Sequence, residues 1–228
     1  MYGYGIDATY ILVIIAAVIS MIASGRVKST YARYAKVAGS SGMTGAECAK
    51  RILQANGIND VTVQHVQGEL TDHYDPRTKT VNLSDSVYGS TSVAAVGVAA
   101  HECGHVIQHH TSYVPLSVRT AIVPVANFGS MASWPIILLG LFLGMGFLVE
   151  IGVFVYVGVV LFQMVTLPVE FDASRRALIQ LNEQQILAPG EVALSKKVLS
   201  AAAMTYVASA AAAILQLIRL LSIANRRR

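Results

Sequence analysis

The residues of this chain best suited to chemistry are His101, Glu102 and His105, which stand in an H-E-x-x-H pattern. On a helix, two residues four positions apart project from one face, so both imidazoles can bind a single Zn²⁺ ion. Glu102 lies between them, where it can accept a proton from a water molecule bound to that ion. The pattern therefore predicts zinc-dependent hydrolysis, with His101 and His105 as metal ligands and Glu102 as the general base.

The composition indicates a membrane protein. Of the 228 residues, 54% are hydrophobic and only 13% are charged, whereas soluble proteins carry about 25% charged residues. The formal net charge of +4 lies mostly beside the apolar runs, which favours contact with lipid headgroups. We expect no nucleic-acid partner, because no basic face with interleaved aromatic residues is evident. Cys48 and Cys103 are interpreted as small buried thiols rather than as a disulfide or metal ligands.

The order of the N-terminal segments predicts the orientation of the chain. Residues 1–25 are expected to contain a transmembrane anchor. The only charged residue in this range before the apolar run is Asp7, and basic residues follow the run. These residues are Arg26, Lys28, Arg33 and Lys36. A cleaved signal peptide would carry its positive charges in front of the apolar run, so a retained anchor is favoured. By the positive-inside rule the next segment is cytoplasmic, which predicts a multi-pass protein of the cell (inner) membrane with its active site on the cytoplasmic side.

Residues 26–118 are predicted to form a cytoplasmic α+β metallopeptidase region. Thr44 and Glu47 have the spacing of a capping box, which opens a short helix. The other expected elements are a strand over 61–65, two hairpin arms over 70–74 and 78–83, and a helix over 93–110 that carries the histidines. The hairpin could offer its free edge to an extended peptide, or it could simply cover the helix.

Residues 119–168 are long enough for a transmembrane helical hairpin with a turn between Gly144 and Glu150. Pro124 and Pro135 should kink or delimit its first helix. A hairpin returns the chain to the side that it left. Residues 169–197 should therefore lie beside the two histidines.

The C-terminal part of the chain is less clearly patterned. A helix is expected over 178–187, and Pro189–Gly190 should end it. Residues 198–228 form an apolar helix with a basic tail, which either makes a fourth span or folds back along the membrane surface. Small-residue faces occur both in this alanine-rich helix and at Gly152 and Gly158 of the preceding hairpin. Such faces suit close packing within one chain or in a homo-oligomer.

A catalytic zinc needs three protein ligands and an open position for water. The candidates for the third ligand are Glu170, Asp172, His109, His73 and Asp72. Glu170 is favoured because it follows the predicted hairpin directly. Its alternative role is that of an interfacial carboxylate paired with Arg175 or Arg176.

Two stretches of the chain resemble known metallopeptidases. The run from Glu170 to Ser174, E-F-D-A-S, resembles the E-F-x-A-D element of the HtpX and CAAX-prenyl membrane proteases, with Ser174 in place of the aspartate. The stretch 70–81, followed by Ala-Ala-His-Glu at 99–102, resembles the corresponding part of the YugP-like neutral zinc metallopeptidases of bacterial membranes. The likeness to this family extends over nearly the whole chain. The resemblance implies a membrane-embedded zinc peptidase with Glu170 as the third zinc ligand.

Together these observations predict a mainly α protein, a multi-pass helical membrane protein with a small cytoplasmic α+β zincin-like domain. The expected function is that of a gluzincin-like metalloendopeptidase acting on membrane or membrane-proximal polypeptides, with Zn²⁺ as cofactor. The candidates for stabilising the oxyanion are His73, Tyr74 and Arg175, although the first two could equally serve hairpin packing. The alternative function is that of a non-proteolytic zinc-binding membrane scaffold or metal-handling protein.

Overall fold

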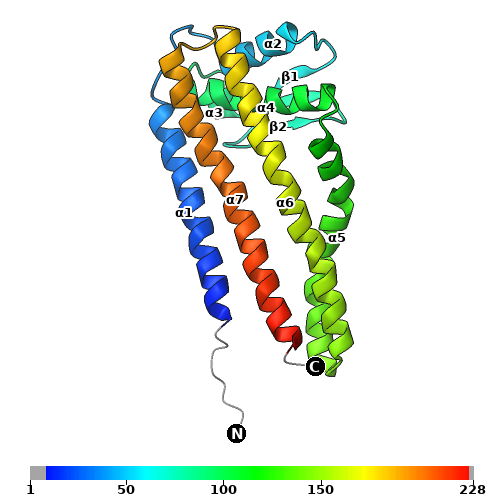
Figure 1. The fold of residues 1–228 in the computed structure, drawn as a ribbon. Coiled ribbons are helices and arrows are strands. Elements are labelled where there is room, and N and C mark those ends of the chain that lie inside the picture. The colour runs from blue at the N-terminus through cyan, green and yellow to red at the C-terminus, as the bar shows by residue number, and fades with distance from the viewer. Residues whose placement is uncertain (1–8, 226–228) are drawn as a thin grey trace. The chain divides into compact units, whose positions relative to one another are not determined.

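The computed structural model describes residues 9–225, so Asp7 and the arginines at 226–228 lie outside the described residues. The described chain is mainly helical, as the sequence predicts, and contains one small sheet (Figure 1). Its elements are α1 (Tyr10–Tyr34), α2 (Gly45–Ala55), β1 (Thr62–His65), β2 (His73–Asp75), β3 (Thr80–Leu83), α3 (Asp85–Tyr88), α4 (Val93–His110), α5 (Val114–Leu143), α6 (Gly146–Glu183) and α7 (Pro189–Asn225).

The chain divides into two compact units. Among the described residues, the first, called the helical unit below, comprises 9–24, 117–167 and 205–225. The second, called the mixed unit, comprises residues 25–116 and 168–204 and contains the sheet. α1, α6 and α7 each contribute residues to both units. α6 and α7, with 38 and 37 residues, are longer than a bilayer span requires.

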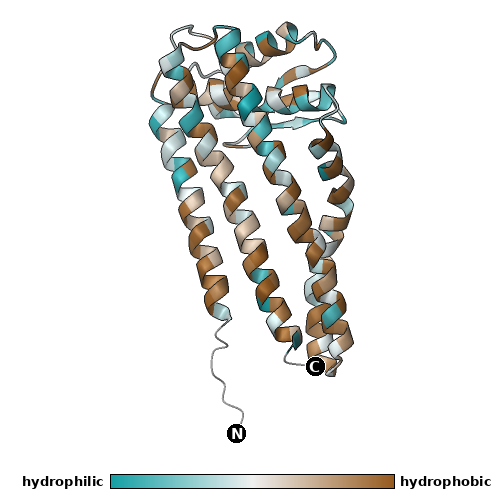
Figure 2. Cartoon of the chain, in the orientation of Figure 1, coloured by the Kyte–Doolittle hydropathy of each residue, from teal (hydrophilic) through white to brown (hydrophobic). Residues whose placement is uncertain are grey.

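Four helices, α1, α5, α6 and α7, are long and apolar enough to cross a membrane. Their apolar stretches stand out in brown in Figure 2. In the helical unit, α5 and α6 approach closely at glycines: a Cβ atom on Gly152 would lie 2.4 Å from Cγ1 of Ile137. The turn between the two helices contains Gly144 at φ +70°, a conformation that suits glycine. The predicted helical hairpin is therefore present, although α5 continues through Pro124 and Pro135 instead of ending at either.

The mixed unit has its own apolar core. Fully buried side chains from α2, β3, α4 and α6 meet there, among them Ile52, Val81, Val96 and Leu181. The predicted capping box at the start of α2 is confirmed. The Thr44 hydroxyl accepts a hydrogen bond from the Glu47 N–H, and the Glu47 carboxylate accepts one from the Thr44 N–H.

The sheet has the strand order β1-β3-β2. β1 runs parallel to β3, and β2 runs antiparallel to β3 with Tyr74 opposite Val81. The predicted hairpin is thus confirmed with shorter arms, and β2 is an edge strand. Asp75 stabilises its turn by accepting a hydrogen bond from the Arg77 N–H at 2.9 Å.

Three helix boundaries differ from the sequence-based expectations. α1 extends to Tyr34, well past the expected anchor, and α6 continues through Pro168 but ends at Glu183 rather than near Leu187. Pro189 begins α7 instead of ending the preceding helix. Proline suits the first position of a helix because the missing N–H would have no partner there anyway.

Candidate metal centre

The two histidines of the H-E-x-x-H pattern lie on α4, as the sequence predicts. Ser92 caps this helix by accepting a hydrogen bond from the Ala95 N–H at 3.2 Å. The rings of His101 and His105 lie on one face, with their centroids 4.8 Å apart. Glu102, between them, is 8% exposed and therefore largely shielded from water.

A glycine inside the pattern allows α6 to approach α4. A Cβ atom at Gly104 would lie 2.4 Å from the carbonyl oxygen of Ala173, so any other residue would force the two backbones apart. A second close contact joins α4 to α7, where a Cβ atom at Gly97 would lie 3.1 Å from Cβ of Ser195. The close approach at Gly104 is the reason that side chains of α6 can reach the histidines.

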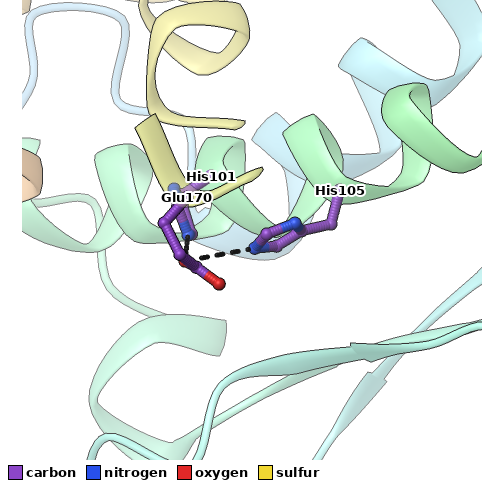
Figure 3. A group of neighbouring side chains, drawn as sticks. All are labelled: His101, His105 and Glu170. Carbon is purple, nitrogen blue, oxygen red and sulfur yellow. Dashed lines mark ion pairs between the residues drawn. The ribbon is translucent and has the colours of Figure 1, made fainter. Parts of the chain in front are cut away.

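The side chain that arrives from α6 is Glu170. Its Oε2 atom lies 3.4 Å from Nε2 of His101 and 3.6 Å from Nε2 of His105 (Figure 3). The Glu170 side chain is only 3% exposed. Among residues 9–225, these three side chains form the one group of His, Cys, Asp and Glu residues whose ligand atoms all lie within 4.8 Å of one another.

These distances fit a zinc ion. Ligand atoms held tetrahedrally at 2.0–2.1 Å from Zn²⁺ are about 3.3–3.4 Å apart. The two histidine–glutamate separations in the group are close to this value. Two imidazoles and one carboxylate are also a donor set found in catalytic zinc sites, which leave the fourth position open.

The other ring nitrogen of each histidine has a different kind of partner. Nδ1 of His101 lies 3.1 Å from the Ser174 hydroxyl, and Nδ1 of His105 lies 3.1 Å from Oε1 of Gln108. Ser174 thus contacts a metal-ligand candidate, and it stands where the E-F-x-A-D element that this run resembles has aspartate. Sequence reasoning missed Gln108, although its place three residues after His105 puts it on the same face of α4.

The electrostatic surroundings of His105 raise its pKa. Burial alone would lower the pKa of His105. The nearby carboxylates of Glu170 and Glu102 outweigh burial, so the pKa of His105 is raised above its ordinary value. A proton therefore competes with a metal ion for Nε2 of His105, the nitrogen that faces Glu170.

Three of the other candidate ligands are engaged elsewhere. Both Asp72 carboxylate oxygens accept hydrogen bonds from Ser84, at the start of α3. The His109 ring packs edge-on against Tyr74, with the centroids 6.0 Å apart. Asp172 pairs with Arg175 at 2.6 Å and with Arg176 at 2.5 Å.

His73 also has local partners. Its Nδ1 lies 2.8 Å from the carbonyl oxygen of Thr71, and its Nε2 lies 3.2 Å from Nδ2 of Asn82. Of the five third-ligand candidates, the structure brings only Glu170 into the group with His101 and His105.

The buried thiols behave as expected. Cys48 and Cys103 are free and fully buried. Burial raises the pKa of Cys48 to about 12 and that of Cys103 well above its ordinary value, so both remain neutral thiols.

Comparison with known proteins agrees with this site. Residues 9–225 match the sequence profile of the family described as "Putative neutral zinc metallopeptidase", whose description implies Zn²⁺ as cofactor. The chain is also 45% identical over 215 residues to the "Putative membrane protease YugP" of Bacillus subtilis (strain 168), a match that covers 94% of this chain and 96% of the relative. No solved structure matches the chain. The protein thus belongs to the neutral zinc metallopeptidase family, in agreement with the resemblance seen in its sequence.

Proposed function

We propose that the protein is a membrane-embedded zinc-dependent endopeptidase that hydrolyses peptide bonds of membrane or membrane-proximal polypeptides. The observation that carries this proposal is the convergence of Glu170 on His101 and His105 at separations that suit zinc. The name of the relative, a membrane protease, agrees with it.

In this proposal His101, His105 and Glu170 hold the ion. When bound there, Zn²⁺ supplies Lewis-acid chemistry, since it acidifies a coordinated water and polarises a carbonyl group. Glu102 accepts the proton of the attacking water and donates it to the leaving amine. Its low exposure supports this role, because electrostatic interactions are stronger where water is excluded.

Among the candidates for stabilising the oxyanion, Tyr74 has the best support. Burial raises the pKa of Tyr74, so its hydroxyl is a hydrogen-bond donor at neutral pH. Its ring packs against His109, which lies one turn beyond His105 on α4. His73 and Arg175 are weaker candidates, because the His73 ring nitrogens are engaged within the hairpin and Arg175 is bound by Asp172.

The edge strand β2 suggests how a substrate could bind. A strand at the edge of a sheet pairs with β3 on one side only and presents the backbone groups of its other side to an incoming chain. An extended polypeptide could add to that edge, with backbone hydrogen bonds that do not depend on its sequence.

The proposed orientation places the mixed unit in the cytoplasm. It rests on the basic residues that follow the first apolar run, Arg26, Lys28, Arg33 and Lys36. Chemical labelling of a single cysteine introduced at Asp75 in intact cells tests it. A loop that reacts with an impermeant reagent from outside would reverse the orientation but leave the chemistry intact.

The activity is tested with the zinc-loaded protein in detergent, using casein and self-cleavage as readouts. Glu102→Gln should retain one zinc ion per chain and lose at least about 100-fold in cleavage rate. Glu183→Gln, which alters an exposed carboxylate at the end of α6, is the matched control and should cleave normally.

Two outcomes would contradict the proposal in different ways. Proteolysis that survives in Glu102→Gln would refute the role of Glu102. A wild-type protein that binds zinc but cleaves neither substrate, with or without a chelator, would instead favour the zinc-binding scaffold or metal-handling alternative.

A further inference from the structure

Gln108 is a fully buried polar side chain on α4, three residues after His105. An amide removed from water costs free energy unless its donors and acceptor find partners. Here both the NH₂ group and the amide oxygen of Gln108 have partners. Nε2 lies 2.8 Å from the carbonyl oxygen of Val169 and 3.0 Å from Oδ2 of Asp172, and Oε1 lies 3.1 Å from Nδ1 of His105.

The chemistry of these partners fixes the orientation of the amide. A backbone carbonyl oxygen and a carboxylate can only accept hydrogen bonds, so the NH₂ group of Gln108 must face Val169 and Asp172. The amide oxygen therefore faces His105. Because that oxygen can only accept, Nδ1 of His105 must carry a hydrogen.

This proton on Nδ1 determines which nitrogen of His105 can bind a metal. A neutral imidazole with hydrogen on Nδ1 has its lone pair on Nε2. Nε2 is the atom that lies 3.6 Å from the Glu170 carboxylate. Gln108 thus selects the tautomer in which the lone pair of His105 points toward the proposed metal position.

Asp172 holds Gln108 in this orientation. Its carboxylate is buried and paired with the guanidinium groups of Arg175 and Arg176. Arg176 also lies over the Tyr113 ring, 5.5 Å from its centroid. These contacts anchor Asp172 as a fixed acceptor beside Gln108.

The partner of His101 imposes no such constraint. The Ser174 hydroxyl can donate or accept a hydrogen bond, because its hydrogen rotates freely. The two imidazoles therefore differ: one is held by a rotatable hydroxyl, and the other by an amide with a single permitted orientation.

We propose that Gln108 is a positioning residue for the metal centre, and that it transmits the fixed orientation of Asp172 to His105. This inference rests on the proposed function, since it assumes that His105 is a zinc ligand. It assigns a role to Gln108 that neither the pattern of the two histidines nor the family description contains.

The first test measures zinc affinity by competition with a chelator. Gln108→Met keeps the side-chain volume nearly constant but removes all three hydrogen bonds, and should weaken zinc binding by about 10–100-fold. Ser195→Ala is the control, because Ser195 is also fully buried in the mixed unit and donates a hydrogen bond to Val93 at 2.6 Å. It should change zinc affinity by no more than about twofold, as expected for a residue that does not support a metal ligand. Zinc affinity of Gln108→Met equal to that of Ser195→Ala would overturn the inference.

The second test needs no variant, so it holds even if Gln108→Met fails to fold. Proton–nitrogen correlation spectra of the zinc-loaded wild-type protein, labelled with ¹⁵N-histidine, show which ring nitrogen carries hydrogen. His105 should carry it on Nδ1 and bind the metal through Nε2. Hydrogen on Nε2 would overturn the inference while leaving the peptidase proposal standing, whereas a wild-type protein without bound zinc would overturn both.

Discussion

The two units of this protein differ in how far they bury their apolar side chains. In the helical unit, Phe142 and Phe154 are 88% and 78% exposed, as expected for side chains that face lipid. In the mixed unit, Ile52 and Val81 are fully buried in a core built from helices and a sheet. The mixed unit thus carries its own apolar core beside the candidate metal centre, while the helical unit depends on its surroundings to cover its apolar surface. Damage to the two units should be separable.

The largest expected effect comes from opening a cavity in the core of the mixed unit. Ile52→Ala should lower the free energy of unfolding by about 2–5 kcal/mol, because the buried methyl groups are lost and a void remains. Phe154→Ala, at an exposed position of the helical unit, should change it by less than about 0.5 kcal/mol. Denaturant unfolding of both variants in the same detergent measures the difference. Equal losses would show that the two units do not differ in this way.

A smaller loss of stability should follow when alanine replaces a glycine at a close contact between two helices. A Cβ atom would lie 2.4 Å from a neighbouring heavy atom at Gly104 in the mixed unit and at Gly152 in the helical unit. Alanine at either position should cost about 1–3 kcal/mol of stability through overpacking. Only Gly104→Ala should also weaken zinc binding, because only this glycine sets the distance between α4 and the helix that carries Glu170. Weaker zinc binding in Gly152→Ala would break the comparison.

The effect that is smallest near neutral pH concerns the pH dependence of stability. Burial holds the pKa of Cys48 at about 12 in the folded chain, whereas an unfolded thiol has a pKa of about 8.5. Below the unfolded value both states keep the proton, so this thiol adds no pH dependence to the stability. Above it only the unfolded chain loses the proton, so stability should fall by up to about 1.4 kcal/mol per pH unit until the folded pKa is reached.

Unfolding experiments between pH 8 and 10 measure this slope. Cys48→Ala should make it shallower, and native Cys48 should resist thiol reagents over the same range. Rapid labelling of the folded protein would contradict the burial of this residue.

The sequence predicted the features that depend on local patterns. The pattern of His101, Glu102 and His105 indicated both the helix and the chemistry, and the spacing of Thr44 and Glu47 indicated a helix start. The two predictions of helical structure are confirmed, because a helix places residues three or four apart on one face. The chemistry stays a prediction.

What the sequence left open depends on tertiary contacts. Five residues were compatible with the third ligand position, and the preference for Glu170 rested on topology and resemblance. The contacts of Gln108 and Ser174 follow from the distance between α4 and α6, which Gly104 sets through a backbone contact that no pattern records. Pro189 was expected to end a helix, but it begins α7. Proline is compatible with both a helix end and a helix start, and only the surrounding structure decides between them.

The central claim is that Glu170 completes the site formed by His101 and His105, and zinc binding by Glu170→Ala tests it most directly. The wild-type protein should bind one zinc ion per chain. Glu170→Ala should lose affinity by more than the roughly 100-fold that a supporting residue can account for, while Glu183→Ala, at the exposed end of the same helix, should bind as the wild type does. Unchanged zinc affinity in Glu170→Ala would contradict the account.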